Sequence, residues 1–437
     1  MCSSDLNVLM SMEDVTAKVN AASKSAKTPE EEFAARKSII AEIERESLQK
    51  TGLRSDVVTL YQGGEYWLYR YKKYTDVRLV FAPEQQIAFF GGDPDNFTYP
   101  RYDLDVAFFR VYENGKPIDS KDYLKWNAKG ATDGDLTFVV GHPGSTARLD
   151  TVAQLQAERD LNGPTTLRLL LDRIRVFKEY SARGPEQARQ ASSNIFGLEN
   201  SRKVYEGRRD GLADASVMAK KQKEEDEFRA KVNANPEWRA AYGGAWDAIA
   251  AAETKLKSRY KEIYYHGFNS SLMNFAQSIV QLVAEVKKPD GQRLAGYHEA
   301  QLESLRFGLT SRAPIYKEME IARMTGALEY DLRDGVEDTF LKTVLNGKSP
   351  AETAKALVTG TRLDDADFRK QLMDGGEAAV AASTDPLIVL ARKLDPMWRE
   401  LTKWREDNID SVEQRSEEHT SERQSRLHLV CRLLLEK

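Results

Sequence analysis

The chain changes character once along its length, and this change constrains the fold more than any other feature. From Val57 to about Val140, short runs of β-branched and aromatic residues are separated by Gly, Pro, Asn and Asp, which is typical of strands. After Gly144 these runs stop, and the sequence becomes charged, rich in Ala and Leu, and spaced like helices. Strands followed by helices, without alternation, argue against a Rossmann or TIM architecture and predict an α+β protein.

Local signals predict the individual elements. Thr28-Pro29 with an acidic first turn indicates the start of a helix that Gly52 ends, and the residues before it form another helical pattern. A hairpin turn is expected at Glu113–Pro117, whose sequence is ENGKP. The predicted strands contain the runs VVTLY, YWLYRY, VRLVFA, VAFFRVY and LTFVVG.

Length and charge exclude several classes of protein. With 437 residues, the chain is long enough for two or three domains of about 150 residues each. Lys plus Arg number 64 and Asp plus Glu number 68, so a net charge of -4 provides no long-range attraction for phosphate backbones. Nucleic acid is therefore not expected as a partner. No apolar stretch approaches the ~18 residues of a membrane span, so none is expected.

Both ends of the chain differ from its interior. MCSSDL at the start and the segment from Arg415 to Ser425 resemble translated sequencing-adapter DNA, so residues 1–6 and 415–437 are expected to be artefacts that pack poorly. Cys2 and Cys431 both lie in these ends, which excludes disulfides, CxxC metal sites and a cysteine nucleophile from the interior. The expected domains between them are N-terminal helices at 7–52, a β-rich region at 53–150 and a helical domain at 151–414.

Three short motifs that suggest cofactors or metals are incomplete. Gly347–Ser349 reads GKS but lacks the earlier glycine of a phosphate loop, because position 342 is Lys. His298-Glu299 opens like a zinc-protease HExxH motif, but position 302 is Leu. The acid-rich GGDPDNF run has neither the register nor the closing glutamate of a calcium loop. The sequence therefore predicts no cofactor and no metal ion.

One segment of the β region is unusually dense in residues that control backbone shape and hydrogen bonding. Between Asp76 and Pro117, two adjacent glycines permit a tight backbone, Asn96 offers donors and an acceptor, and Pro100 stiffens the path towards Asp105. Such a segment positions polar groups. The alternative from residue chemistry alone is an ordered loop whose Asp and Asn side chains only cap its own turns.

These residues also carry a resemblance. DVRLVFAP, the block from Gly91 to Asp105, FFRVY and the run GHPGST at Gly141–Thr146 are similar to the bacterial serine dipeptidyl peptidases of the dipeptidyl peptidase 7 and 11 type, serine-peptidase family 46. A weaker similarity continues through LENSRKVYEG and covers most of the interior. The resemblance implies a partial trypsin-like β-barrel region followed by a large all-α helical domain.

The family pattern implies a Ser-His-Asp mechanism in which Asp105 orients the histidine that deprotonates the serine. Asn96 and Phe97 match the asparagine and the aromatic residue that hold the free α-amino group of the substrate, although the family usually has Trp where this chain has Phe97. Asn200 matches a helical-domain asparagine that also contacts the amine. Alternatively, Asn200 is only a polar residue on a solvated helix face.

The family motifs that carry the catalytic histidine and serine are absent from this chain, so the resemblance implies a fragment with one catalytic residue of three. A local triad of Asp105, His142 and Ser145 is a conceivable alternative, although the family has other residues at the His142 position. The expected activity is release of dipeptides from free peptide N termini, with localisation in the periplasm or at the cell surface, or secretion. The other functional class is a non-catalytic helical scaffold with a β domain. The oligomeric state is left open, a homodimer being one option.

Overall fold

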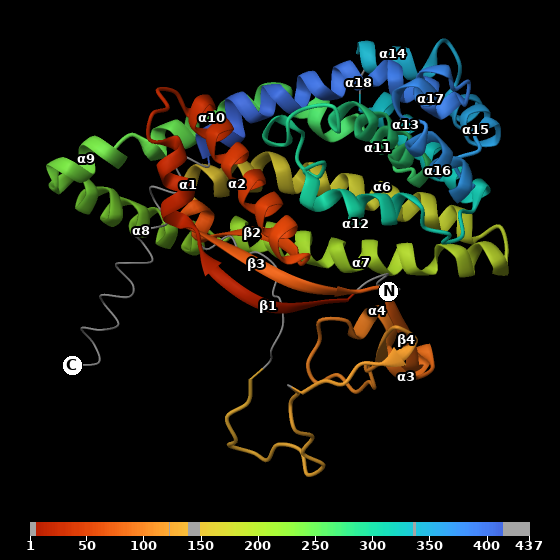
Figure 1. Cartoon of the computed structure of the whole chain (residues 1–437), viewed down its shortest axis with the longest axis horizontal. Helices are drawn as coiled ribbons and strands as arrows, with labels where there is room; N and C mark the ends of the chain where they lie inside the picture. Colours follow the sequence, from red (N-terminus) through yellow and green to blue (C-terminus); the bar gives the residue numbers. More distant parts are fainter. Residues whose placement is uncertain (1–5, 122, 139–148, 335–337, 414–437) are drawn as a thin grey trace. The chain divides into compact units, whose positions relative to one another are not determined.

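The computed structural model describes residues 6–121, 123–138, 149–334 and 338–413, and it confirms the α+β class (Figure 1). Two three-stranded sheets have the orders β1-β3-β2 and β4-β5-β6. Within the described residues these sheets do not close into a barrel. The strands are β1 Leu6–Asp14, β2 Arg54–Leu60, β3 Glu65–Tyr74, β4 Asp76–Phe81, β5 Phe108–Glu113 and β6 Lys116–Pro117.

The chain divides into two compact units, which are described separately. The small unit holds the residues up to Met10 and Tyr71–Asp150, and the helical unit holds Ser11–Arg70 and the chain from Thr151 onward. In the small unit, β4 and β5 pair antiparallel, and β5 turns into β6. Asn114 and Gly115 both have positive φ values, 54° and 75°, as a type I′ turn requires. The predicted ENGKP hairpin is therefore confirmed.

Helices dominate the chain after Thr151. Short 3₁₀ segments occur at Tyr61–Gly63 and Asp290–Gln292, and π-helical turns at Glu158–Asn162 and Glu406–Asp410. The α-helices are α1 Thr16–Ser23, α2 Pro29–Thr51, α3 Gln85–Ala88, α4 Gly92–Asp95, α5 Val152–Ala157, α6 Gly163–Ser181, α7 Pro185–Ala213, α8 Ala215–Ala234, α9 Pro236–Tyr242, α10 Ala245–Tyr265, α11 Ser271–Glu285, α12 Glu299–Leu309, α13 Lys317–Arg333, α14 Thr339–Leu345, α15 Pro350–Gly360, α16 Ala366–Asp374, α17 Gly376–Ala382 and α18 Pro386–Arg405. Among these described helices, none is both long enough and apolar enough to cross a bilayer.

Two predicted elements need correction. The N-terminal region 7–52 is not wholly helical, because it begins with strand β1, Leu6–Asp14, which pairs with β3. Backbone pairing with a distant strand outweighs the weak helical pattern of these residues. Of the predicted LTFVVG strand, Leu136–Phe138 is not in a strand, and its other residues lie outside the described part of the chain.

Helices α1 and α2 pack on the first sheet and form a small core (Figure 1). Thr28 caps α2 by accepting a hydrogen bond from the Glu31 N–H at 3.2 Å, and Gly52 ends the helix with a φ of 68°. Both predicted ends of this helix are confirmed. The core buries Val15, Val19, Ile43, Tyr66 and Leu68.

A larger apolar core lies among helices α11 to α18, where α11 packs against α18 and α13 against α15 (Figure 1). Its fully buried side chains include Leu272, Ile279, Leu363, Leu387 and Leu394. α6 lies along α7 and α13. Gly326 on α13 permits this close approach, because a Cβ at that position would collide with the Val176 side chain of α6.

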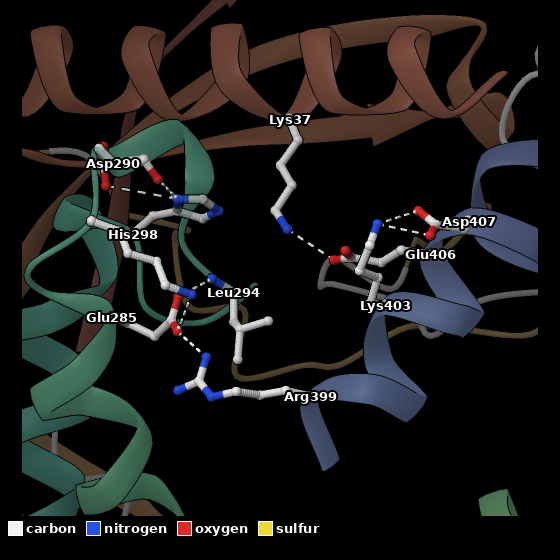
Figure 2. Close-up of polar contacts among 10 residues, drawn as sticks. Lys37, Glu285, Asp290, Leu294, His298, Arg399, Lys403, Glu406 and Asp407 are labelled. Atoms are coloured by element: carbon white, nitrogen blue, oxygen red, sulfur yellow. Dashed lines mark hydrogen bonds and ion pairs between the residues drawn. The ribbon is translucent and has the colours of Figure 1, made fainter. Parts of the chain in front are cut away.

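Charged groups join α2 to the rest of the helical unit. Lys37 of α2 pairs with Glu406, just after the C-terminal end of α18, at 2.8 Å (Figure 2).

A second group of charged side chains surrounds Glu285, at the end of α11. Glu285 is fully buried and accepts hydrogen bonds from the Leu294 N–H and from Arg399 (Figure 2). Burial alone would raise the pKa of Glu285, but these donors and Lys288 together hold it below its ordinary value. The buried charge is stabilised because it is fully paired.

The buried Glu44 of α2 is expected to make stability depend on pH. Its carboxylate accepts the Val57 N–H at 2.8 Å, but burial raises the pKa of Glu44 to about 7. A carboxyl group with a raised folded-state pKa contributes most to stability below its unfolded value of about 4.5, and this contribution is lost as the pH rises towards 7. Glu44→Gln keeps an acceptor for Val57 and should stabilise the protein at pH 8 by roughly 2 kcal/mol while changing little at pH 4.

Thermal unfolding of both proteins between pH 4 and pH 8 measures this difference. Glu46→Gln is the matched control, because Glu46 is about half exposed in a pair with Lys18 and its loss should be nearly neutral at every pH. A Glu44→Gln effect that is the same at pH 4 and pH 8 would show that Glu44 keeps an ordinary pKa in the folded protein.

Candidate active-site loop

The loop between β4 and β5 folds around its glycines. Gly91 and Gly92 have positive φ values, 78° and 62°. A Cβ at Gly91 would overlap the Asp95 side chain, so only glycine fits there. The Asp95 carbonyl oxygen accepts hydrogen bonds from the N–H of Thr98 at 3.0 Å and from its hydroxyl at 2.6 Å. The glycines therefore allow the tight turn that presents the residues after Asp95.

Arg101 organises the polar groups of this loop. One of its terminal nitrogens donates to the Asn96 side-chain oxygen at 3.1 Å, and its Nε lies 2.8 Å from an Asp103 carboxylate oxygen. Its guanidinium also lies over the Phe89 ring, 5.0 Å from the ring centre. Arg101 thus fixes the orientation of the Asn96 amide. The amide oxygen has two lone pairs, so it can accept from a second donor such as an ammonium group.

Phe97 is held in an unusual position for a large aromatic residue. Its φ is 70°, in the left-handed region that non-glycine residues rarely adopt, and 65% of its surface is exposed. An outward aromatic ring in a strained backbone is a common feature of binding loops. The ring could provide the face of a cation–π contact next to the Asn96 amide.

Asp105 lies at the end of the loop, just before β5. The Leu104 N–H donates to the Ile87 carbonyl at 3.0 Å, which ties this end of the loop to α3. Asp105 itself is exposed, and Arg101 pairs with Asp103 instead.

Asn200 lies on α7, in the helical unit, and is partly buried. One turn before and after it, Phe196 and Val204 are 43% and 44% exposed. The adjacent Glu199 is buried and binds Lys178 and Arg202 at 2.7 and 2.6 Å. This face of α7 therefore carries exposed apolar groups around an amide, rather than only solvated charges.

Asn96, Phe97 and Asp105 all lie in one continuous loop of the small unit. Asn200 belongs to the other unit, so its predicted proximity to Asn96 stays a prediction. The alternative triad of Asp105, His142 and Ser145 stays untested, because His142 and Ser145 lie outside the described residues. Arg101 was not among the predicted site residues, although it directly follows Pro100 in the motif. The described residues contain no group of three His, Cys, Asp or Glu side chains arranged to hold a metal.

The small unit is poor in buried apolar groups. None of the buried hydrophobic residues of the described chain belongs to it. Its surface instead carries many exposed large apolar side chains, among them Leu79, Val80, Phe90, Leu124 and Trp126. Exposed apolar area on this scale marks an interaction surface.

The family model of Peptidase S46 matches residues 3–426, and the chain therefore belongs to this peptidase family. The match overlaps both ends of the chain, and the interpretation of 1–6 and 415–437 as adapter sequence stays a prediction. Those ends lie almost entirely outside the described residues, except for Leu6 in β1.

Two curated relatives have named activities. The Asp/Glu-specific dipeptidyl-peptidase of Shewanella putrefaciens is 29% identical over 358 residues, which are 77% of this chain and 48% of the relative. Dipeptidyl-peptidase 7 of Phocaeicola vulgatus is 31% identical over 233 residues, which are 50% of this chain and 32% of the relative. The chain thus spans less than half the length of either protein.

The fold is shared with a solved structure. The crystal structure of Porphyromonas endodontalis DPP11 in complex with the dipeptide Arg-Glu matches with a TM-score of 0.70 at 19% identity, covering 96% of this chain and 63% of that one. At this identity the likeness concerns the fold alone.

Proposed function

We propose that the chain is part of a serine dipeptidyl peptidase that releases dipeptides from free peptide N termini. Membership of the peptidase family and the dipeptidyl-peptidase names of the relatives support the reaction class. The observation that carries the assignment to this chain's residues is the Gly91–Asp105 loop, in which Arg101 orients Asn96 beside the exposed ring of Phe97. A scaffold protein has no need of this arrangement. The enzyme is proposed to work in the periplasm or at the cell surface.

In this proposal, the loop and α7 recognise the substrate amine. Asn96 accepts a hydrogen bond from the α-ammonium group, Phe97 provides an aromatic face and Asn200 supplies a second amide. An α-amine fixed in this way places the second peptide bond at the reacting serine, which limits the product to a dipeptide. Asp105 orients the catalytic histidine by accepting its Nδ1–H and stabilises the imidazolium that forms when the serine is deprotonated.

The histidine and the serine are proposed to come from residues outside this chain, which would then be a fragment. The length relative to its relatives and the exposed apolar surface of the small unit support this. Exposed apolar side chains on β4 and β5, such as Leu79, Val80 and Phe109, are what part of a trypsin-like barrel would leave without its other strands.

The isolated chain is expected to have no peptidase activity, because Asp105 without a base and a nucleophile supports no acylation. Purified chain should be assayed with fluorogenic dipeptidyl substrates of acidic and apolar types. The gene product extended in both directions serves as the positive control and should hydrolyse at least one type. Hydrolysis by the isolated chain that Asp105→Asn abolishes would contradict the fragment proposal and favour the local triad with His142 and Ser145.

A further inference from the structure

A small cavity in the helical unit is surrounded by charged groups that the proposed peptidase reaction does not use. It measures about 10 Å³ and lies between α6, α13 and the segment that joins α10 to α11. This volume has room for one particle of about the size of a water molecule. Its polar lining comprises Asp172, Arg173, Tyr264, Asn269, Arg323 and Asp331.

Two arginines at the cavity have buried donors that the protein does not satisfy. The Nε atoms of Arg173 and Arg323 are both buried, and neither has a hydrogen-bond acceptor among the described residues. The terminal nitrogens of Arg323 are engaged, with Glu320 at 2.7 Å and Asn269 at 3.4 Å. A buried donor without an acceptor costs about 1–3 kcal/mol, so two of them at one cavity indicate a missing acceptor.

The carboxylates at the cavity do not supply this acceptor. Asp172 is bound to Arg175 and Arg333, both at 2.9 Å. Burial, together with the charges of neighbouring acids, raises the pKa of Asp331 to about 8, so this group is largely neutral at pH 7. Burial also lowers the pKa of Arg173, and the charge of Arg323 adds to this effect. The two guanidinium groups therefore lie near each other, while Glu320 already pairs with Arg323 and Asp172 is engaged by Arg175 and Arg333.

We propose that this cavity binds one halide ion, chloride at physiological salt, between the Nε–H groups of Arg173 and Arg323. The small space at this cavity suits a monatomic anion rather than phosphate or sulfate. The ion accepts from both arginines and offsets their repulsion, and it thereby joins α6 to α13. Gly326 lets these two helices approach closely beside the site.

Chloride should raise the thermal stability of the chain specifically. The midpoint of unfolding is measured at constant ionic strength while sodium gluconate is replaced by sodium chloride, and bromide serves as a second halide. We expect a saturating rise of about 3 °C by 200 mM chloride. Equal unfolding midpoints in gluconate and in chloride would overturn the proposal and indicate that water, and not chloride, occupies the cavity.

Two variants separate the site from general salt effects. Arg173→Met should abolish the chloride response. Arg189→Met, on α7 and outside the cavity lining, removes a 62% exposed side chain that binds Glu186 and should keep the response. A response that survives Arg173→Met contradicts the proposal. If Arg173→Met does not fold, crystals of the unaltered protein grown in sodium bromide decide, because an anomalous peak is expected within hydrogen-bond distance of both Nε atoms and its absence would exclude the site.

Discussion

Replacing Asp105 by asparagine in the extended gene product is expected to lower kcat about 10⁴-fold. Asparagine keeps the size of the side chain, but it removes the negative charge that stabilises the imidazolium and can hold the histidine in the wrong tautomer. KM should change little, because Asp105 does not contact the substrate in the proposed mechanism. Steady-state kinetics with a fluorogenic dipeptidyl substrate measures both constants.

Asp119→Asn is the matched control for this experiment. Asp119 is exposed and follows β6 in the same unit, so its variant should retain nearly full activity. A loss of less than about tenfold in the Asp105→Asn protein would be too small for a triad aspartate. That result would show that Asp105 is not a catalytic residue. Its match to the family motif would then indicate a shared fold only.

The largest expected loss of stability follows from replacing Arg369. This arginine is fully buried, donates to the carbonyls of Leu309 at 2.6 Å and Leu363 at 2.5 Å and also to that of Ser311, and lies over the Phe275 ring. Arg369→Met fills much of the same space but leaves three carbonyl oxygens without their donor. The expected cost is about 4 kcal/mol, which corresponds to a fall in Tm of roughly 10 °C.

Lys370→Met tests whether the effect is specific to the buried position. Lys370 is the next residue on α16, and its exposed ion pair with Asp374 should contribute about 0.5 kcal/mol or less. A Tm for Arg369→Met within about 2 °C of the unaltered protein would mean that water or other donors reach the three carbonyls.

The parts of the fold that the sequence predicts well depend on contacts between near neighbours. The start and end of α2 follow from the Thr28 cap and from Gly52, and the β5–β6 hairpin follows from Asn114-Gly115. Strand β1 could not be predicted in this way. Its conformation depends on pairing with β3, which begins about fifty residues later at Glu65, and its own residues do not specify that partner.

The same distinction applies to the candidate site. Residue types alone mark the segment that contains Asn96 and Asp105 as one that positions polar groups, but they leave a loop that only caps its own turns as the alternative. The roles of both residues came from the family resemblance. The role of Arg101 was not predicted, since its contact with Asn96 and its position over Phe89 arise only when the loop closes. For Asn200, the helical pattern predicts which face of α7 carries the side chain. Which residues of the other unit it contacts depends on tertiary structure, which the pattern does not specify.

The central claim is that the Gly91–Asp105 loop belongs to an exopeptidase and recognises the free α-amino group of its substrate. The most direct measurement compares hydrolysis of one fluorogenic dipeptidyl substrate, with a free and with an acetylated N terminus, by the extended gene product and its Asn96→Ala variant. We predict that acetylation lowers kcat/KM at least about 100-fold in the unaltered enzyme, and that Asn96→Ala removes most of this preference, because a charge-assisted hydrogen bond contributes about 1.5–3 kcal/mol. Equal hydrolysis of the free and acetylated substrates, or an undiminished preference in Asn96→Ala, would contradict the account.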